Sequence, residues 1–206
     1  MSLSAAALIK LVAKHELRVF TTADIITLTG LAPAAATKAL TRLAAEDLVG
    51  RIKKGVWISK MTADFNPYEA VPYLRRPWPA YISLYSALAD YGVVEEIPHI
   101  VYGVSAAPPK RYRTSIGEFS IHHLPAHLIW GYEIKRQGQA SYPVAEPEKA
   151  FLDLVYLALI PRSPLEMPHK RERKWDLDKN KLKRYAERYK FKPLTNWLKK
   201  ELGLHF

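Results

Sequence analysis

The chain has 206 residues, no cysteine and a formal net charge of +11. This length allows one large domain or two small ones, and the 49% share of hydrophobic residues can build a buried core. The lack of cysteine excludes disulfide bonds, thiolate catalysis and cysteine-based zinc fingers. No apolar run is long enough to cross a bilayer, and the first sixteen residues lack a signal-peptide pattern. The sequence therefore predicts a cytoplasmic protein without a membrane partner.

The positive charge is concentrated at the two ends of the chain. Residues 1–60 carry nine Lys and Arg against four Asp and Glu, and residues 161–206 carry fourteen against six. Residues 61–160 carry eight against ten. A basic surface attracts polyanions, of which nucleic acid is the commonest in cytosol. Solubility alone would also explain a basic surface, so charge by itself leaves both interpretations open.

The first helices of the N-terminal part follow from apolar spacing and from the residues that start and stop helices. Apolar residues within "LSAAALIKLVAKHE" recur at helical spacing and predict a first helix. Val19 and Phe20 are expected to form a short extended link. Thr22 can cap a second helix, Asp24 suits its first turn, and Gly30 can end it in the left-handed conformation.

A third helix and a hairpin complete this N-terminal part. Pro33 suits the first position of a helix, and an apolar stripe follows at Ala36, Leu40, Leu43 and Ala44. Residues 48–52 and 56–58 read as two short strands. The turn between them is Lys53-Lys54-Gly55.

Three helices followed by a hairpin is the order of elements in a winged helix-turn-helix. In that fold the third helix enters the major groove of DNA, and the hairpin lies along the backbone or in the minor groove. The predicted third helix keeps an outer face that carries no acidic residue, whereas a merely solvated face usually mixes charges of both signs. The residues left on that face are Ala34, Ala35, Thr37, Lys38, Thr41 and Arg42.

The remainder of the chain is predicted to be a connector and a second domain. Residues 61–79 contain four prolines and several aromatic residues, which indicates a structured bridge. "AYISLYSALADYG" is predicted to be a helix ending at Gly92. Extended segments follow in "HIVYGVS", "KRYRT", "EFSIHHL", "LIWGYEI" and "SYPVA". We therefore expect an α+β protein with a winged helix-turn-helix at 1–60, a connector at 61–79 and a mixed α/β domain at 80–206.

Helices are predicted to close the chain. One begins near Pro147 and Glu148 and presents apolar residues on one side. After a loop marked by prolines, including Pro168, two amphipathic helices follow, and Gly203 ends the second. Their outer faces are rich in lysine and arginine.

No catalytic or metal site stands out. His122 and His123 are adjacent on a predicted strand, so they point to opposite faces, and Pro125 interrupts the pattern before His127. The stretch "AEPEK", with Glu146, Glu148 and Lys149, has an acidic and lysine composition found in metal-dependent nucleases. However, no strand carboxylate precedes it, and the sequence contains no phosphate loop and no nucleophile elbow. We therefore expect no enzymatic activity, no cofactor and no metal.

Several segments together resemble the AbiEi antitoxins of AbiE toxin–antitoxin systems. They are "RIKKGVWI", "PAYISLYSALADYGVVEEIPHIVYGVS", "KRYRTSIGEFSIHHLPAHLIWGYE" and "YPVAEPEKAFLDLVYLAL", and the resemblance covers about residues 3–160. It implies a transcriptional autorepressor that binds inverted repeats in double-stranded operator DNA. It also implies antitoxin activity of the C-terminal domain against a co-encoded nucleotidyltransferase toxin. The DNA contacts implied by position are Thr37, Lys38, Thr41, Arg42, Lys53 and Lys54.

Two other functions remain as alternatives at this stage. The C-terminal domain could bind a small metabolite that changes the affinity of the N-terminal domain for its operator. The chain could also be an enzyme acting on nucleic acid, an interpretation supported only by the basic charge and Glu148.

One departure from the family pattern affects the DNA contact. Ala32 precedes Pro33, whereas family members often carry Ser or Thr near the start of the third helix, so a phosphate contact from such a hydroxyl is not expected here.

Overall fold

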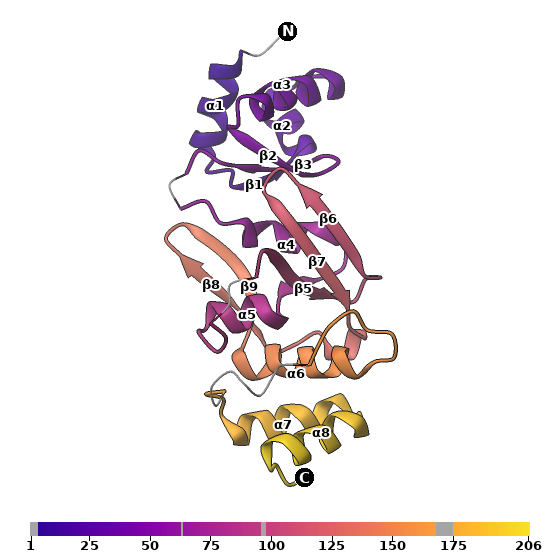
Figure 1. Ribbon diagram of the computed structural model, residues 1–206. Helices are drawn as coiled ribbons and strands as arrows, with labels where there is room; N and C mark the ends of the chain where they lie inside the picture. The colour runs from indigo at the N-terminus through magenta and orange to yellow at the C-terminus, as the bar shows by residue number, and fades with distance from the viewer. Residues whose placement is uncertain (1–3, 63, 96–97, 168–174) are drawn as a thin grey trace.

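A computed structural model describes residues 4–62, 64–95, 98–167 and 175–206. These residues form a mixed fold with eight α-helices and two β-sheets. Figure 1 shows the elements stacked along one long axis, with the N-terminal helices at one end and the C-terminal helices at the other. Pro168, expected in the loop before the terminal helices, lies outside the described residues.

The N-terminal unit consists of three helices and a small antiparallel sheet. Its elements are α1 (Ala5–Lys14), β1 (Val19–Thr21), α2 (Thr22–Thr29), α3 (Pro33–Ala45), β2 (Val49–Lys53) and β3 (Val56–Ser59). The strand order is β1-β3-β2. Val19 and Phe20, expected as a mere link, therefore form an edge strand that pairs with Ile58 and Trp57 of β3.

Helix α2 begins one residue earlier than expected. Its N-cap is Thr21 and not Thr22, because the Thr21 hydroxyl accepts from Asp24 N while the Asp24 carboxylate accepts from Thr21 N. This reciprocal capping box satisfies two backbone donors at once. Gly30 ends the helix with φ of 67°, as the sequence predicted.

The connector contains two short helical segments, η1 (Pro67–Ala70) and α4 (Val71–Leu74). It is fastened to the N-terminal unit through Arg18, whose guanidinium donates to Glu69 at 2.7 Å and to Asp64 at 2.9 Å. Both carboxylates belong to the connector, and Glu69 is buried. A charge-assisted pair of this kind fixes the path of the chain between the two sheets.

The second unit is built on a six-stranded mixed sheet in the order β6-β7-β5-β4-β9-β8. Its strands are β4 (Ala80–Ile82), β5 (Ile100–Ser105), β6 (Lys110–Thr114), β7 (Gly117–His123), β8 (Tyr132–Gln137) and β9 (Ala140–Ala145). The central pair β4 and β5 is antiparallel, whereas β5 with β7 and β4 with β9 are parallel.

Two predicted segments of this unit are corrected by the structure. "AYISLYSALADYG" is not one helix, because Ala80–Ile82 form the fully buried strand β4 and only Leu84–Asp90 form helix α5. "LIWGYEI" is not wholly extended, because Leu128 belongs to the 3-10 turn η2 (Ala126–Leu128) and β8 begins at Tyr132. In both cases contacts distant in sequence decide the local structure.

Three helices lie beyond the second sheet on the side away from the N-terminal unit, with two of them packed on the first (Figure 1). They are α6 (Pro147–Leu159), α7 (Lys179–Tyr189) and α8 (Lys192–Leu202). Helix α6 packs between α5 and the pair α7 and α8. Gly203 ends α8 in the left-handed conformation, as predicted.

A buried polar network joins α6 to α7 and to Ser83 at the start of α5. Lys149 and Asp153 are fully buried and form an ion pair along α6. The Tyr189 hydroxyl of α7 donates to Asp153 Oδ1 at 2.6 Å, and Ser83 Oγ donates to Asp153 Oδ2 at 2.8 Å. Burial lowers the pKa of Lys149, and the adjacent Asp153 carboxylate opposes that shift.

The two units have separate hydrophobic cores that meet at the hairpin of β2 and β3. Val49 and Trp57 pack into the core under α1–α3, whereas Ile52, Val56 and Ile58 belong to the core of the second unit. Alternating strand residues point to opposite faces, so one hairpin serves both cores. The expected domain boundaries at residues 60 and 79 stay a prediction.

Candidate nucleic-acid interface

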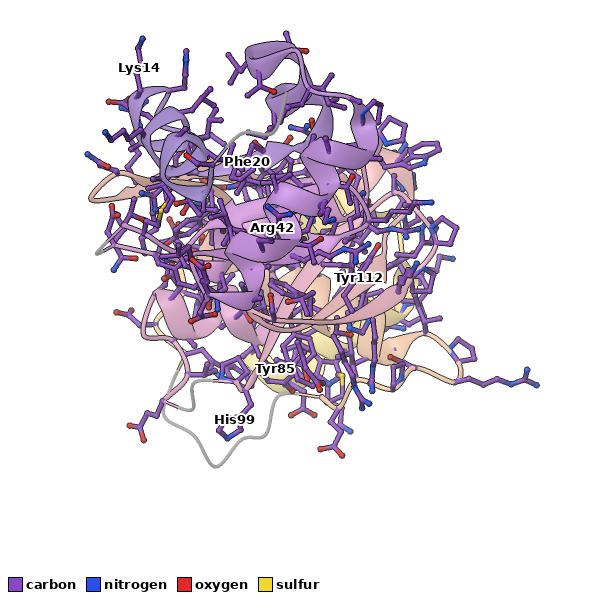
Figure 2. The ribbon with its side chains drawn as sticks, turned by 90° about the horizontal axis from the view of Figure 1, so that it is seen from above. Lys14, Phe20, Arg42, Tyr85, His99 and Tyr112 are labelled. Atoms are coloured by element: carbon purple, nitrogen blue, oxygen red, sulfur yellow. The ribbon has the colours of Figure 1, made fainter. Side chains whose placement is uncertain are left out.

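Helix α3 presents the side chains expected for a groove-reading helix on its exposed face. Ala36, Leu40 and Leu43 are completely buried. The helical period then turns the opposite side outward. Figure 2 looks down on this end of the molecule, with Arg42 labelled on α3. The predicted contact residues exposed there are Thr37, Lys38, Thr41 and Arg42.

The two threonines are already bonded within the helix. Thr37 Oγ1 donates to Pro33 O at 2.9 Å, and Thr41 Oγ1 donates to Thr37 O at 2.9 Å. Each hydroxyl proton is thereby used, so each oxygen is left as an acceptor beside an exposed methyl group. In this rotamer the threonines can accept from base amino groups or touch a thymine methyl, but they cannot donate to a phosphate.

The two cations of this face are open to a ligand. Within the part of the chain that the structure describes, neither Lys38 nor Arg42 forms an ion pair. Acidic residues follow only after α3 ends, and Asp47 is paired with Lys60 at 2.6 Å. The N-cap Ala32 has no side-chain capping bond. The start of the helix is therefore lined by small residues, which allows close approach.

The structure shortens the predicted turn, because Lys53 is the last residue of β2 and only Lys54 and Gly55 form the turn. Gly55 has φ of 75°, the left-handed value that the turn requires. Lys53 Nζ donates to the backbone oxygen of Leu74 at 3.2 Å. Burial, with repulsion from Arg75, Arg76 and Lys110, lowers the pKa of Lys53. Lys54 is exposed, so it is the lysine of this turn that is free to extend into solvent.

The hairpin is held against the second unit. Arg51 N donates to Ser115 Oγ at 3.1 Å, at the tip of the β6–β7 hairpin. A Cβ added at Gly50 would lie 2.3 Å from Ile116 Cγ2, so the close approach requires glycine there. The orientation of the turn relative to the second sheet is therefore set by direct contact.

Sequence reasoning missed the cations that surround this turn. Arg75, Arg76 and Lys110 line the same groove as Lys53 and Lys54, although they come from the connector and β6. The available signal was the pair of short basic runs "RRPWP" and "PPKRYR" within the otherwise neutral middle of the chain. Sequence alone did not indicate that the fold brings them to the hairpin.

The residues considered for catalysis have other partners. Glu148 is buried, pairs with Lys181 at 2.9 Å and accepts from Asp178 N. Glu146 accepts from the Tyr185 hydroxyl at 2.6 Å. These contacts join the start of α6 to α7.

The histidines lie as predicted, with His122 buried and His123 exposed on opposite faces of β7. His122 Nε2 lies 3.0 Å from Ser120 Oγ. Among the described residues no group of three His, Asp or Glu could hold a metal ion.

Buried His122 makes stability depend on pH. Burial, with repulsion from Arg111, lowers the pKa of His122 from 6.5 to about 4. Below pH 6.5 the unfolded chain takes up a proton that the folded chain refuses, so stability is lost as the pH falls toward 4. We expect the wild-type chain to lose about 2 kcal/mol more than His122→Gln between pH 7 and 4.5, measured by urea unfolding. The matched variant His123→Gln should behave as wild type, and equal losses in all three proteins would contradict this role.

Comparisons with known proteins leave the family open. No protein-family model matches the chain, and no curated protein matches it. Across the described ranges, no helix is both long and apolar enough to span a bilayer.

Proposed function

We propose that the chain is a sequence-specific DNA-binding repressor whose N-terminal unit acts as a winged helix-turn-helix. The observation that carries this proposal is the exposed face of α3, where Lys38 and Arg42 stand beside Thr37 and Thr41 without an acidic partner among the described residues. The order of three helices and a hairpin supports it as well. In this reading α3 enters the major groove of double-stranded operator DNA.

The chemistry of each side chain decides which part of the DNA it can contact. Arg42 can bond a guanine edge with two donors, and Lys38 can reach a guanine or a phosphate. Thr37 and Thr41, as acceptors with exposed methyls, suit adenine, cytosine or thymine edges. Lys54 of the hairpin turn contacts the backbone, whereas Lys53 contributes charge from its bonded position.

The second unit is proposed to supply antitoxin activity against a co-encoded nucleotidyltransferase toxin. This rests on the order of sequence segments that resemble AbiEi antitoxins. The repressor then binds inverted repeats upstream of its own reading frame, in the cytoplasm, without a cofactor and without enzymatic activity.

Two experiments test the two halves of the proposal. The full chain should bind a duplex taken from the DNA upstream of its own reading frame at least about 1,000-fold tighter than random duplex, measured by fluorescence anisotropy at fixed salt. Co-expression should restore growth to cells that produce the nucleotidyltransferase encoded beside it. Equal affinity for both duplexes would refute sequence-specific repression, and unrelieved toxicity would refute the antitoxin role.

A further inference from the structure

A basic groove lies where the hairpin turn meets the connector and β6. It has a volume of about 440 Å³ and is contributed by three segments distant in sequence. No Asp or Glu of the described ranges lines it. Its lining includes five cationic residues and one exposed tryptophan: Lys53, Lys54, Arg75, Arg76, Lys110 and Trp78.

The five cations of this basic groove have no counterion in the described part of the chain, because none of them forms an ion pair there. Burial lowers the pKa of Lys53, and repulsion from Arg75, Arg76 and Lys110 lowers it further. Like charges gathered without a carboxylate repel one another. An anion in the groove would relieve that repulsion.

Most of these cations are positioned by neutral groups, which leaves donors for a ligand. Arg75 Nη1 donates to the Tyr112 hydroxyl at 3.0 Å, and Arg75 Nε is buried without a partner. The Arg76 guanidinium lies 3.9 Å from the ring centre of Tyr73, and Lys110 Nζ lies 5.2 Å from that of Tyr112. Stacking on a ring face orients a cation while its N–H groups stay available.

An exposed aromatic residue completes the groove. The Trp78 side chain is 51% exposed, one of the largest exposed apolar surfaces in the described residues. An indole beside clustered cations offers a base a surface for stacking next to a binding site for its phosphate. Guanidinium and ammonium groups are the usual protein ligands of phosphate.

We propose that this groove is a phosphate-binding site, in which Trp78 offers a stacking surface to the base of a free nucleotide. The phosphate belongs to a nucleotide or to the DNA backbone. The inference deepens the proposed function, since Lys53 at the end of β2 and Lys54 in the hairpin turn are both assigned to DNA. The face of α3 is not part of the groove, so the two sites can be tested separately.

The experiment replaces exposed groove residues one at a time. Arg76→Ala and Lys110→Ala are compared with Arg136→Ala, an exposed arginine of β8 at the opposite edge of the second sheet. Titration of sodium pyrophosphate and of AMP is followed by calorimetry, and binding of a 20-base-pair duplex by anisotropy over a salt series. Trp78→Phe and Trp78→Ala test the stacking.

For a free nucleotide, each groove variant should weaken pyrophosphate and AMP about tenfold, and Arg136→Ala should leave both unchanged. Trp78→Ala should weaken AMP but not pyrophosphate, and Trp78→Phe should retain much of the affinity for AMP. For backbone phosphate, each groove variant should instead lower the salt slope for the duplex by about 1. Either pattern supports the site and names the source of its phosphate.

The site is refuted if Arg76→Ala and Lys110→Ala match Arg136→Ala with every ligand. Stacking is refuted if AMP binds Trp78→Ala as it binds wild type. A Lys38→Ala/Arg42→Ala variant separates this inference from the proposed function. It should bind pyrophosphate like wild type and lose specific DNA binding. Unchanged operator binding in this variant would refute only the repressor.

Discussion

Replacing Lys38 and Arg42 together with alanine is expected to weaken operator binding about 100-fold, because each lost contact in the groove costs roughly 1–3 kcal/mol. Both side chains are exposed on α3, and neither has an acidic partner in the described residues. Their removal should therefore affect binding and leave the fold intact. Anisotropy with operator and random duplex, at several salt concentrations, measures the effect.

The single variants separate base reading from charge. Arg42→Ala should weaken operator more than random duplex, whereas Lys54→Ala should weaken both equally and lower the salt slope by about 1. Lys199→Ala on α8, at the far end of the molecule in Figure 1, is the matched control for a lost lysine. Equal losses on operator and random duplex for Arg42→Ala would make it a phosphate contact.

Asp153→Ala is expected to lower the free energy of unfolding by about 3–5 kcal/mol. Asp153 is fully buried and accepts from Lys149, Tyr189 and Ser83. Without the carboxylate, the buried Lys149 ammonium loses its counterion and keeps only the Tyr189 hydroxyl, to which it donates at 2.9 Å. Urea unfolding followed by tryptophan fluorescence measures the loss.

Two comparisons make the Asp153 result specific. Glu118→Ala breaks an ion pair with Arg113 whose side chains are 87% and 49% exposed, and it should cost less than about 1 kcal/mol. Lys149→Met/Asp153→Leu removes both charges and should recover much of the stability, because a packed apolar pair avoids the unpaired charge. A loss for Asp153→Ala no larger than for Glu118→Ala would show that the pair contributes little.

The N-terminal elements were predictable because local chemistry determines them. Gly30 and Pro33 delimit α2 and α3, and the buried stripe of α3 has a clear helical period. The N-cap of α2 was assigned to the wrong residue because Thr21 and Thr22 are chemically alike. What selects Thr21 is its extended backbone and its spacing to Asp24, which together form the capping box.

The central strand could not be found by periodicity. All three residues of β4 are buried, so the segment lacks the alternation that identifies a half-exposed strand. Its pairing with β5 and β9 lies outside any local window. A short apolar run next to the helix-forming segment "SALAD" was therefore read as part of one helix.

Only the α3 part of the candidate site could be predicted from the sequence. The exposed face of α3 follows from the stripe formed by Ala36, Leu40 and Leu43. The surroundings of Lys53 do not, because Leu74 and Lys110 are brought there by tertiary packing. Charge counts give the number of cations in a segment but not which cations become neighbours.

The hairpin of β2 and β3 contributes side chains to the hydrophobic cores of both units, so the stability of each unit depends on the other. Trp57 belongs to one core and Ile58 to the other, so the same hairpin lies between the two cores and packs against both. Melting of either core removes part of the other, which favours a single cooperative unfolding transition. The β6–β7 hairpin of the second sheet also contacts Gly50 and Arg51 of β2, the strand that packs against α3. A chimaera with a related protein would have to keep this hairpin together with both of its neighbours, since a cut at residue 60 leaves Ile52, Val56 and Ile58 facing water.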